Sequence, residues 1–140
     1  MIGENTKKWI VKAMEDYRIA GHELTFPDED IATSPVCFHC QQVTEKLLKA
    51  YLIAKHIDFE KTHDLEHLLE LCIEQEIEFK NLDVGNLTSY AVEARYPDEF
   101  YIPSVEEAKK CFEIASRVKN FIFKKLNIHN SKDLMEENKK

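Results

Sequence analysis

The sequence is poor in the residues that interrupt helices. Its 140 residues include only 3 Gly and 4 Pro, too few for a fold built from many tight turns. The three glycines lie far apart along the chain, which excludes a glycine-rich phosphate-binding loop. Strand patterns of useful length are also absent. The chain is instead rich in Leu, Glu, Lys and Ala, a composition typical of a helical bundle.

Long apolar runs and a positive net charge are missing too. No segment approaches the ~18 consecutive apolar residues of a membrane span, and the first residues hold no apolar stretch typical of a secretory signal. Together with four cysteines, which suggest reduced thiols, this predicts a cytoplasmic protein without membrane contact. The net charge of −7 argues against DNA as a partner, because a DNA-binding face is basic.

Apolar residues recur every three or four positions in several segments, as in helices with one buried face. Ser34 is the predicted N-cap of the second helix, and Ser104 with Glu107 forms a predicted capping box before the last one. The sequence therefore predicts one all-α domain of about five helices over residues 1–126, followed by a frayed polar tail over 127–140. The expected helices cover approximately residues 5–24, 35–56, 65–73, 84–94 and 105–126.

Cys37 and Cys40 have the C-x-x-C spacing of a zinc knuckle or a redox dithiol. On the predicted helix Cys40 falls in the apolar stripe and Cys37 on its edge, so both can be small buried residues. A zinc site requires four ligands, and the sequence holds no second pair of this kind. A dithiol at a helix N-terminus is the alternative, although the usual βαβ context is absent. We expect packing residues, with no metal and no cofactor.

The same helix carries a polar stripe, in which His39, Gln42, Lys46 and Lys49 follow one another at three, four and three residues. This spacing places the four side chains on one side of the helix, beside the apolar stripe. A solvated face would look the same. A row of hydrogen-bond donors also suits a phosphate or a nucleotide.

Two further segments allow a structural and a functional interpretation. His63 and Asp64 at a helix start are either a capping pair or a site histidine with an orienting neighbour. Arg95 and Tyr96 precede Pro97, so they are either a helix stop with a packed ring or a phosphate-recognition site. Arg is scarce in this chain, and its planar guanidinium can bind phosphate or carboxylate through two hydrogen bonds. Both interpretations of this segment stay open.

Three segments, taken in order, resemble the motifs of the HEPN domain family (higher eukaryotes and prokaryotes nucleotide-binding). Residues 39–50 resemble its signature H-x-Q-Q-x-x-E-K-x-L-K-A on the second helix. Residues 62–65, with Leu68 and Leu69, resemble its T/G-H-D/N-L-x-x-L-L segment at the start of the third. Residues 94–97 resemble its A-R-Y-P motif after the fourth. The resemblance extends over approximately residues 8–126.

The resemblance implies an up-and-down bundle, commonly a homodimer, with a cleft near the ends of the second and fourth helices. Many members act with a minimal nucleotidyltransferase in toxin–antitoxin-like systems. Others are metal-independent ribonuclease toxins that carry an Arg followed after four to six residues by a His. This chain lacks that pair after Arg95, and Arg18 is followed by His22 at a shorter spacing and on another helix.

The missing pair favours a binding module over an enzyme. We expect this module to be a homodimer that binds a nucleotide or another phosphate group and partners a nucleotidyltransferase. The alternatives are a divergent ribonuclease toxin acting on RNA and a plain dimeric interaction protein. The predicted ligand-binding residues are Arg95, Tyr96, His39, Gln42, Lys46 and His63.

Overall fold

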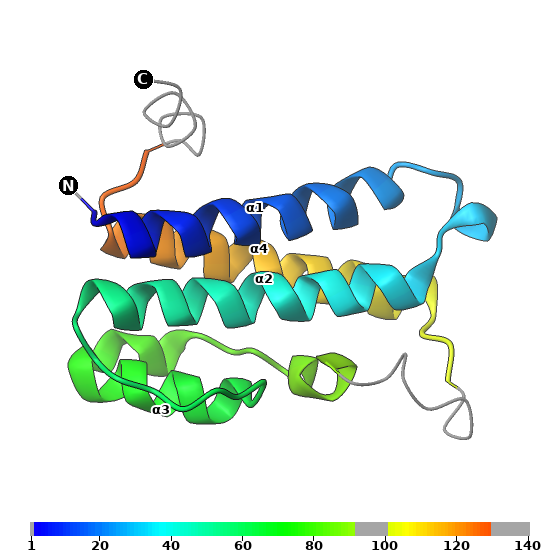
Figure 1. The fold of residues 1–140 in the computed structure, drawn as a ribbon. Helices are drawn as coiled ribbons and strands as arrows, with labels where there is room; N and C mark the ends of the chain where they lie inside the picture. Colours follow the sequence, from blue (N-terminus) through cyan, green and yellow to red (C-terminus); the bar gives the residue numbers. More distant parts are fainter. Residues whose placement is uncertain (1, 92–100, 130–140) are drawn as a thin grey trace.

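The computed structural model describes residues 2–91 and 101–129, and all regular secondary structure in these ranges is helical. The all-α prediction is therefore confirmed. Four α-helices are joined by loops that contain three short 3-10 helices (Figure 1). The elements are α1 (Glu4–Glu23), η1 (Asp28–Asp30), α2 (Thr33–Ala54), α3 (Leu65–Gln75), η2 (Ile77–Asn81), η3 (Leu87–Ala91) and α4 (Val105–Lys125).

Helix α2 is the centre of the bundle. It packs against α1, α3, η3 and α4, and in Figure 1 it runs antiparallel to α1 with α3 on its other side. Because neighbours cover it from several directions, most of its apolar side chains are buried, and Val43, Leu47, Leu48 and Tyr51 are fully so. This central position also explains why polar residues of α2 contact more than one neighbouring element.

Two helices begin with a capping side chain, at positions where the sequence predicted a cap. Ser104 is the N-cap of α4, and its Oγ accepts a hydrogen bond from the backbone N–H of Glu107 at 3.1 Å. Asp64 is the N-cap of α3, where Oδ1 accepts from the N–H of His67 at 3.2 Å. Each carboxylate or hydroxyl satisfies a backbone donor that has no partner within its helix.

The start of α2 differs from the prediction. The helix begins at Thr33 with Ala32 as its N-cap, so Ser34 lies inside the first turn. The Thr33 hydroxyl donates to the carbonyl oxygen of Pro103 at 2.7 Å, which fixes this end of α2 beside the start of α4. Pro35 lies two residues further into the helix than expected, and it still fits there because the N–H groups of the first turn have no intrahelical acceptor.

The segment expected as a helix over residues 84–94 also differs. Its described part holds the 3-10 helix η3, and residues 92–94 lie outside the described residues. Gly85 has a φ of 55°, and its N–H is held by Asp83 Oδ1 at 2.7 Å. A residue in this left-handed region interrupts helical geometry, so the α-helix cannot begin at Val84. Of the predicted tail, residues 130–140 lie outside the described residues.

Candidate functional site

The first polar cluster of α2 is centred on Asp16 of α1, and we call it the Asp16 cluster (Asp16, His39 and Lys46). Asp16 is buried, and its two carboxylate oxygens bind different groups. Oδ1 lies 2.7 Å from His39 Nδ1, and Oδ2 lies 2.7 Å from Lys46 Nζ. His39 and Lys46 are two turns apart on α2, so one carboxylate from α1 joins two members of the predicted polar stripe.

The second cluster is centred on Glu45, and we call it the Glu45 cluster (Gln41, Glu45, Lys49 and His63). Glu45 is only 4% exposed. Its Oε1 accepts from His63 Nδ1 at 2.7 Å and from Gln41 Nε2 at 3.1 Å, and its Oε2 accepts from Lys49 Nζ at 2.9 Å. His63, which precedes α3, is therefore attached to the middle of α2 by a buried carboxylate.

These contacts stabilise the charged form of Glu45. Burial alone would raise the pKa of this carboxyl group, but hydrogen bonds from His63, Lys49 and Gln41 lower it below the ordinary value. Lys49 is itself buried, although the sequence placed it on the polar stripe. Its ammonium group lies 5.4 Å from the ring centre of Trp9 and 5.9 Å from that of Phe59, so two aromatic rings and one carboxylate surround the charge.

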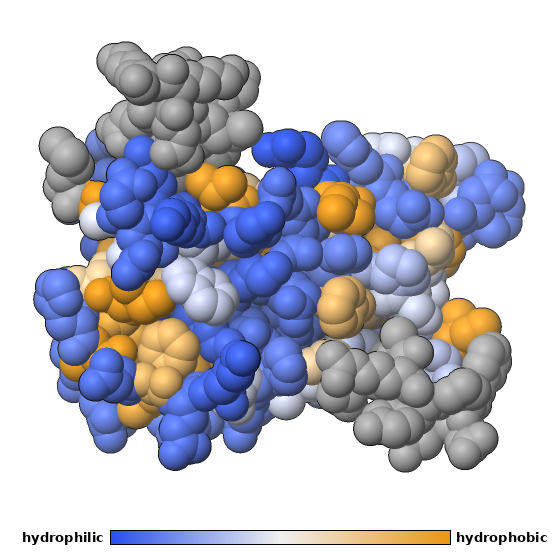
Figure 2. Space-filling view, viewed as in Figure 1, coloured by the Kyte–Doolittle hydropathy of each residue, from blue (hydrophilic) through white to orange (hydrophobic). Residues whose placement is uncertain are grey.

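Gln42 joins the Glu45 cluster through its neighbour. Gln42 Nε2 donates to Gln41 Oε1 at 2.7 Å, and Gln41 Nε2 also lies 3.3 Å from the carbonyl oxygen of His63. The predicted site residues therefore separate into two groups, with His39 and Lys46 on Asp16 and with Gln42 and His63 near Glu45. The face over α1 and α2 is mostly hydrophilic (Figure 2).

Arg95 and Tyr96, the remaining predicted ligand-binding residues, lie outside the described residues. The tyrosines on either side of that segment are described. The hydroxyl groups of Tyr90 and Tyr101 both donate to the carboxylate of Glu107 in the first turn of α4. Burial opposes ionisation of Glu107, but these two hydrogen bonds lower its pKa, and burial beside this carboxylate raises the pKa of Tyr90.

The two cysteines of the C-x-x-C spacing are packing residues, as the sequence predicted. Cys37 and Cys40 are both fully buried in the core, and Cys37 Sγ lies 3.5 Å from Cys111 Sγ of α4. Burial raises the pKa of Cys40, the opposite of the shift that activates a redox thiol. Among residues 2–91 and 101–129, no three His, Cys, Asp or Glu side chains are grouped so that they could hold a metal ion.

A cavity of about 490 Å³ lies beside the Asp16 cluster, and we call it the α1–α2 cavity. Lys46 contributes from α2, and the other lining residues come from α1. Sequence reasoning did not include this side of α1, because helical spacing shows which residues share a face but not which helix lies opposite. The lining residues are Lys12, Glu15, Asp16, Arg18, Ile19, His22 and Lys46.

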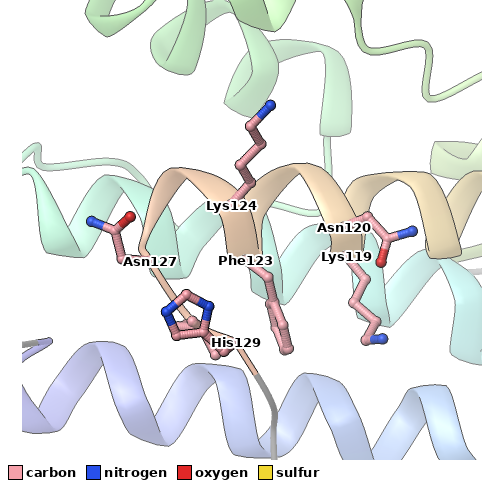
Figure 3. A pocket seen from close by; sticks show the side chains of 7 residues that line it. Lys119, Asn120, Phe123, Lys124, Asn127 and His129 are labelled. Atoms are coloured by element: carbon pink, nitrogen blue, oxygen red, sulfur yellow. The ribbon is translucent and has the colours of Figure 1, made fainter.

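A different cavity, of about 450 Å³, lies at the end of α4 and contains no predicted site residue (Figure 3). Lys119 lines it, and its ammonium group lies over the rings of Tyr17 at 5.2 Å and Phe123 at 5.4 Å. Lys124 in the last turn and His129 beyond the helix also line it. A cation in the last turn, such as Lys124, stabilises the negative end of the helix dipole, which gives it a structural role.

None of the helices in the described part of the chain is sufficiently long and apolar to cross a membrane. A family model described as the HEPN domain matches residues 6–126. No curated protein and no solved structure matches the chain significantly. The family match covers most of the sequence and agrees with the helical bundle and with the motifs on α2 and before α3. The chain belongs to the HEPN domain family.

Proposed function

We propose that this HEPN domain binds a nucleotide or another phosphate-bearing group on the polar side of α2 and acts as the partner of a minimal nucleotidyltransferase. The observation that carries the proposal is the Asp16 cluster. His39 and Lys46 both belong to the family signature on α2, and both are bonded to Asp16, which lines the α1–α2 cavity together with Lys46. Groups already held in place lose less conformational entropy when they bind a ligand.

A thermal unfolding experiment tests the ligand. We expect ATP or GTP at millimolar concentration to raise the melting temperature, alone or with the nucleotidyltransferase, because the ligand binds only the folded state. At a hundredfold excess over Kd, the stabilisation is about 3 kcal/mol. Lys46→Gln should reduce the shift. Lys109→Gln, which removes an exposed α4 lysine paired with Asp28, should preserve it.

An absence of any shift with either nucleotide, with and without the partner, would contradict the ligand. The partner has its own measurement, since co-purification and sizing chromatography distinguish a hetero-complex from a homodimer. A hetero-complex with the nucleotidyltransferase supports the proposal. A homodimer that binds neither the enzyme nor a nucleotide supports the plain interaction protein instead.

One observation favours a second candidate function, metal-independent cleavage of RNA. His39 and His63 each have Nδ1 bonded to a buried carboxylate, which leaves Nε2 of each ring for proton transfer. Labelled RNA incubated in EDTA tests this function. Cleavage that is lost in Arg95→Ala and in His63→Gln would support the ribonuclease, and intact RNA with the wild-type protein would eliminate it.

A further inference from the structure

The α1–α2 cavity contains a guanidinium group that no described side chain neutralises. Arg18 lines the cavity and makes no ion pair or hydrogen bond within residues 2–91 and 101–129. Arg117 of α4 is a useful contrast, because it is similarly exposed but lies 3.7 Å from Glu113. Of the two described arginines, Arg18 is therefore the one whose guanidinium N–H groups are available to bind a ligand.

The two carboxylates of the cavity are already paired with cations. Asp16 uses one oxygen for His39 and the other for Lys46. Glu15 lies 3.4 Å from Lys12. Since both carboxylates have cationic or hydrogen-bonding partners within the protein, they oppose an incoming anion less than free carboxylates would. The uncompensated positive charge in this cavity belongs to Arg18.

The donors converge from two helices. Arg18 and His22 are four residues apart on α1 and so share one face of it, while Lys46 approaches from α2. Lys46 remains 22% exposed although it is bonded to Asp16, and an ammonium group has three donors. Ile19 also lines the cavity, is 50% exposed and offers an apolar contact.

We propose that Arg18, His22 and Lys46 form a phosphate subsite, which receives the phosphate group of the nucleotide bound by this domain. This inference rests on the proposed function and assigns it two residues of α1. Arg18 binds two phosphate oxygens in a bidentate manner, Lys46 binds a third oxygen, and the His22 imidazole donates an N–H. Asp16 is a positioning residue that holds Lys46 at the cavity.

The scarcity of arginine provides a direct measurement. The chain contains three arginines, Arg18, Arg95 and Arg117, so the Nε–Hε signals in a ¹H–¹⁵N NMR spectrum are few and can be assigned with Arg18→Gln and Arg117→Gln. We expect inorganic pyrophosphate and ATP to shift the Arg18 signal and to leave the Arg117 signal in place. Adenosine, which has no phosphate, should shift neither signal.

Affinity provides the second readout. Arg18→Gln should weaken ATP binding about tenfold or more, because a charge-assisted bidentate contact is lost. His22→Gln should weaken it less, and Arg117→Gln should leave it unchanged. Each substitution is at an exposed helix position, and circular dichroism of each variant checks that the helical fold is retained.

The outcomes distinguish this inference from the proposed function. If ATP stabilises the protein but Arg18→Gln binds it normally, the subsite is wrong and the nucleotide function stands. If pyrophosphate shifts the Arg18 signal while no nucleotide stabilises the protein, the subsite is correct and the nucleotide is wrong. Equal shifts of Arg18 and Arg117, or an equal response to adenosine, would overturn the subsite.

Discussion

Glu45 is the buried charge on which several polar contacts of α2 depend. We expect Glu45→Gln to lower the free energy of unfolding by about 3 kcal/mol, because removal of one partner leaves the buried ammonium group of Lys49 without its carboxylate. Urea unfolding of both proteins gives the difference. Glu113→Gln removes an exposed carboxylate paired with Arg117 and is the matched control, with an expected change below about 1 kcal/mol.

The pH dependence of stability follows from the lowered pKa of the same residue. Since the pKa of Glu45 is lower in the folded than in the unfolded state, its contribution is present above the ordinary value of 4.5 and is lost as the pH falls through the folded value. We expect the wild-type protein to lose stability in this acidic range. Glu45→Gln should lose less, and parallel curves for the two proteins would contradict the assignment.

At the scale of single residues, helical spacing predicted which side chains of α2 lie near one another better than it predicted their partners. His39 and Lys46 share the carboxylate of Asp16, whereas Gln42, from the same predicted stripe, contacts Gln41 of the Glu45 cluster. Asp16 was not predicted, since it reaches α2 only through the packing of two helices. The burial of Lys49 was missed for the same reason, as Trp9 and Phe59 come from other parts of the chain.

Among the elements, the start of α4 offers a sharp comparison between two serines. Ser104→Ala should lower the free energy of unfolding by about 1 kcal/mol, because the N–H of Glu107 loses its acceptor. Ser34→Ala is the control. The sequence predicted Ser34 as an N-cap too, but it lies inside the first turn of α2, so its substitution should have little effect. Urea unfolding of the two variants measures both changes, and equal losses would contradict the two assignments.

The helices themselves were largely predictable. The observed ends of α1, α2 and α4 lie within about two residues of the expected ones, because each helix has a clear apolar stripe and a recognisable break. The segment after Asp83 was less predictable. Its apolar spacing resembles that of a helix, but the left-handed conformation of Gly85 is imposed by the surrounding fold and is not evident from spacing.

The whole molecule is organised around α2, which predicts cooperative unfolding. Each of the other described α-helices, and η3, packs against α2. Unfolding of α2 would therefore expose the core that all of them share. We expect one two-state transition in urea. The chain has a single tryptophan, Trp9, which contacts Lys49, so fluorescence and far-UV circular dichroism should give the same midpoint. Separate midpoints would show that α1 detaches before the remaining helices.

The contacts of Glu107 with two tyrosines bear on how the length of the chain can change between related sequences. Because Tyr90 and Tyr101 meet at one carboxylate, the chain between them is closed at its base by described residues of the bundle. The free-energy cost of closing a loop rises only slowly with its length, by about 0.6 kcal/mol per doubling. The number of residues between the two tyrosines can therefore change at a small cost in free energy, as long as Tyr90, Tyr101 and Glu107 keep their contacts.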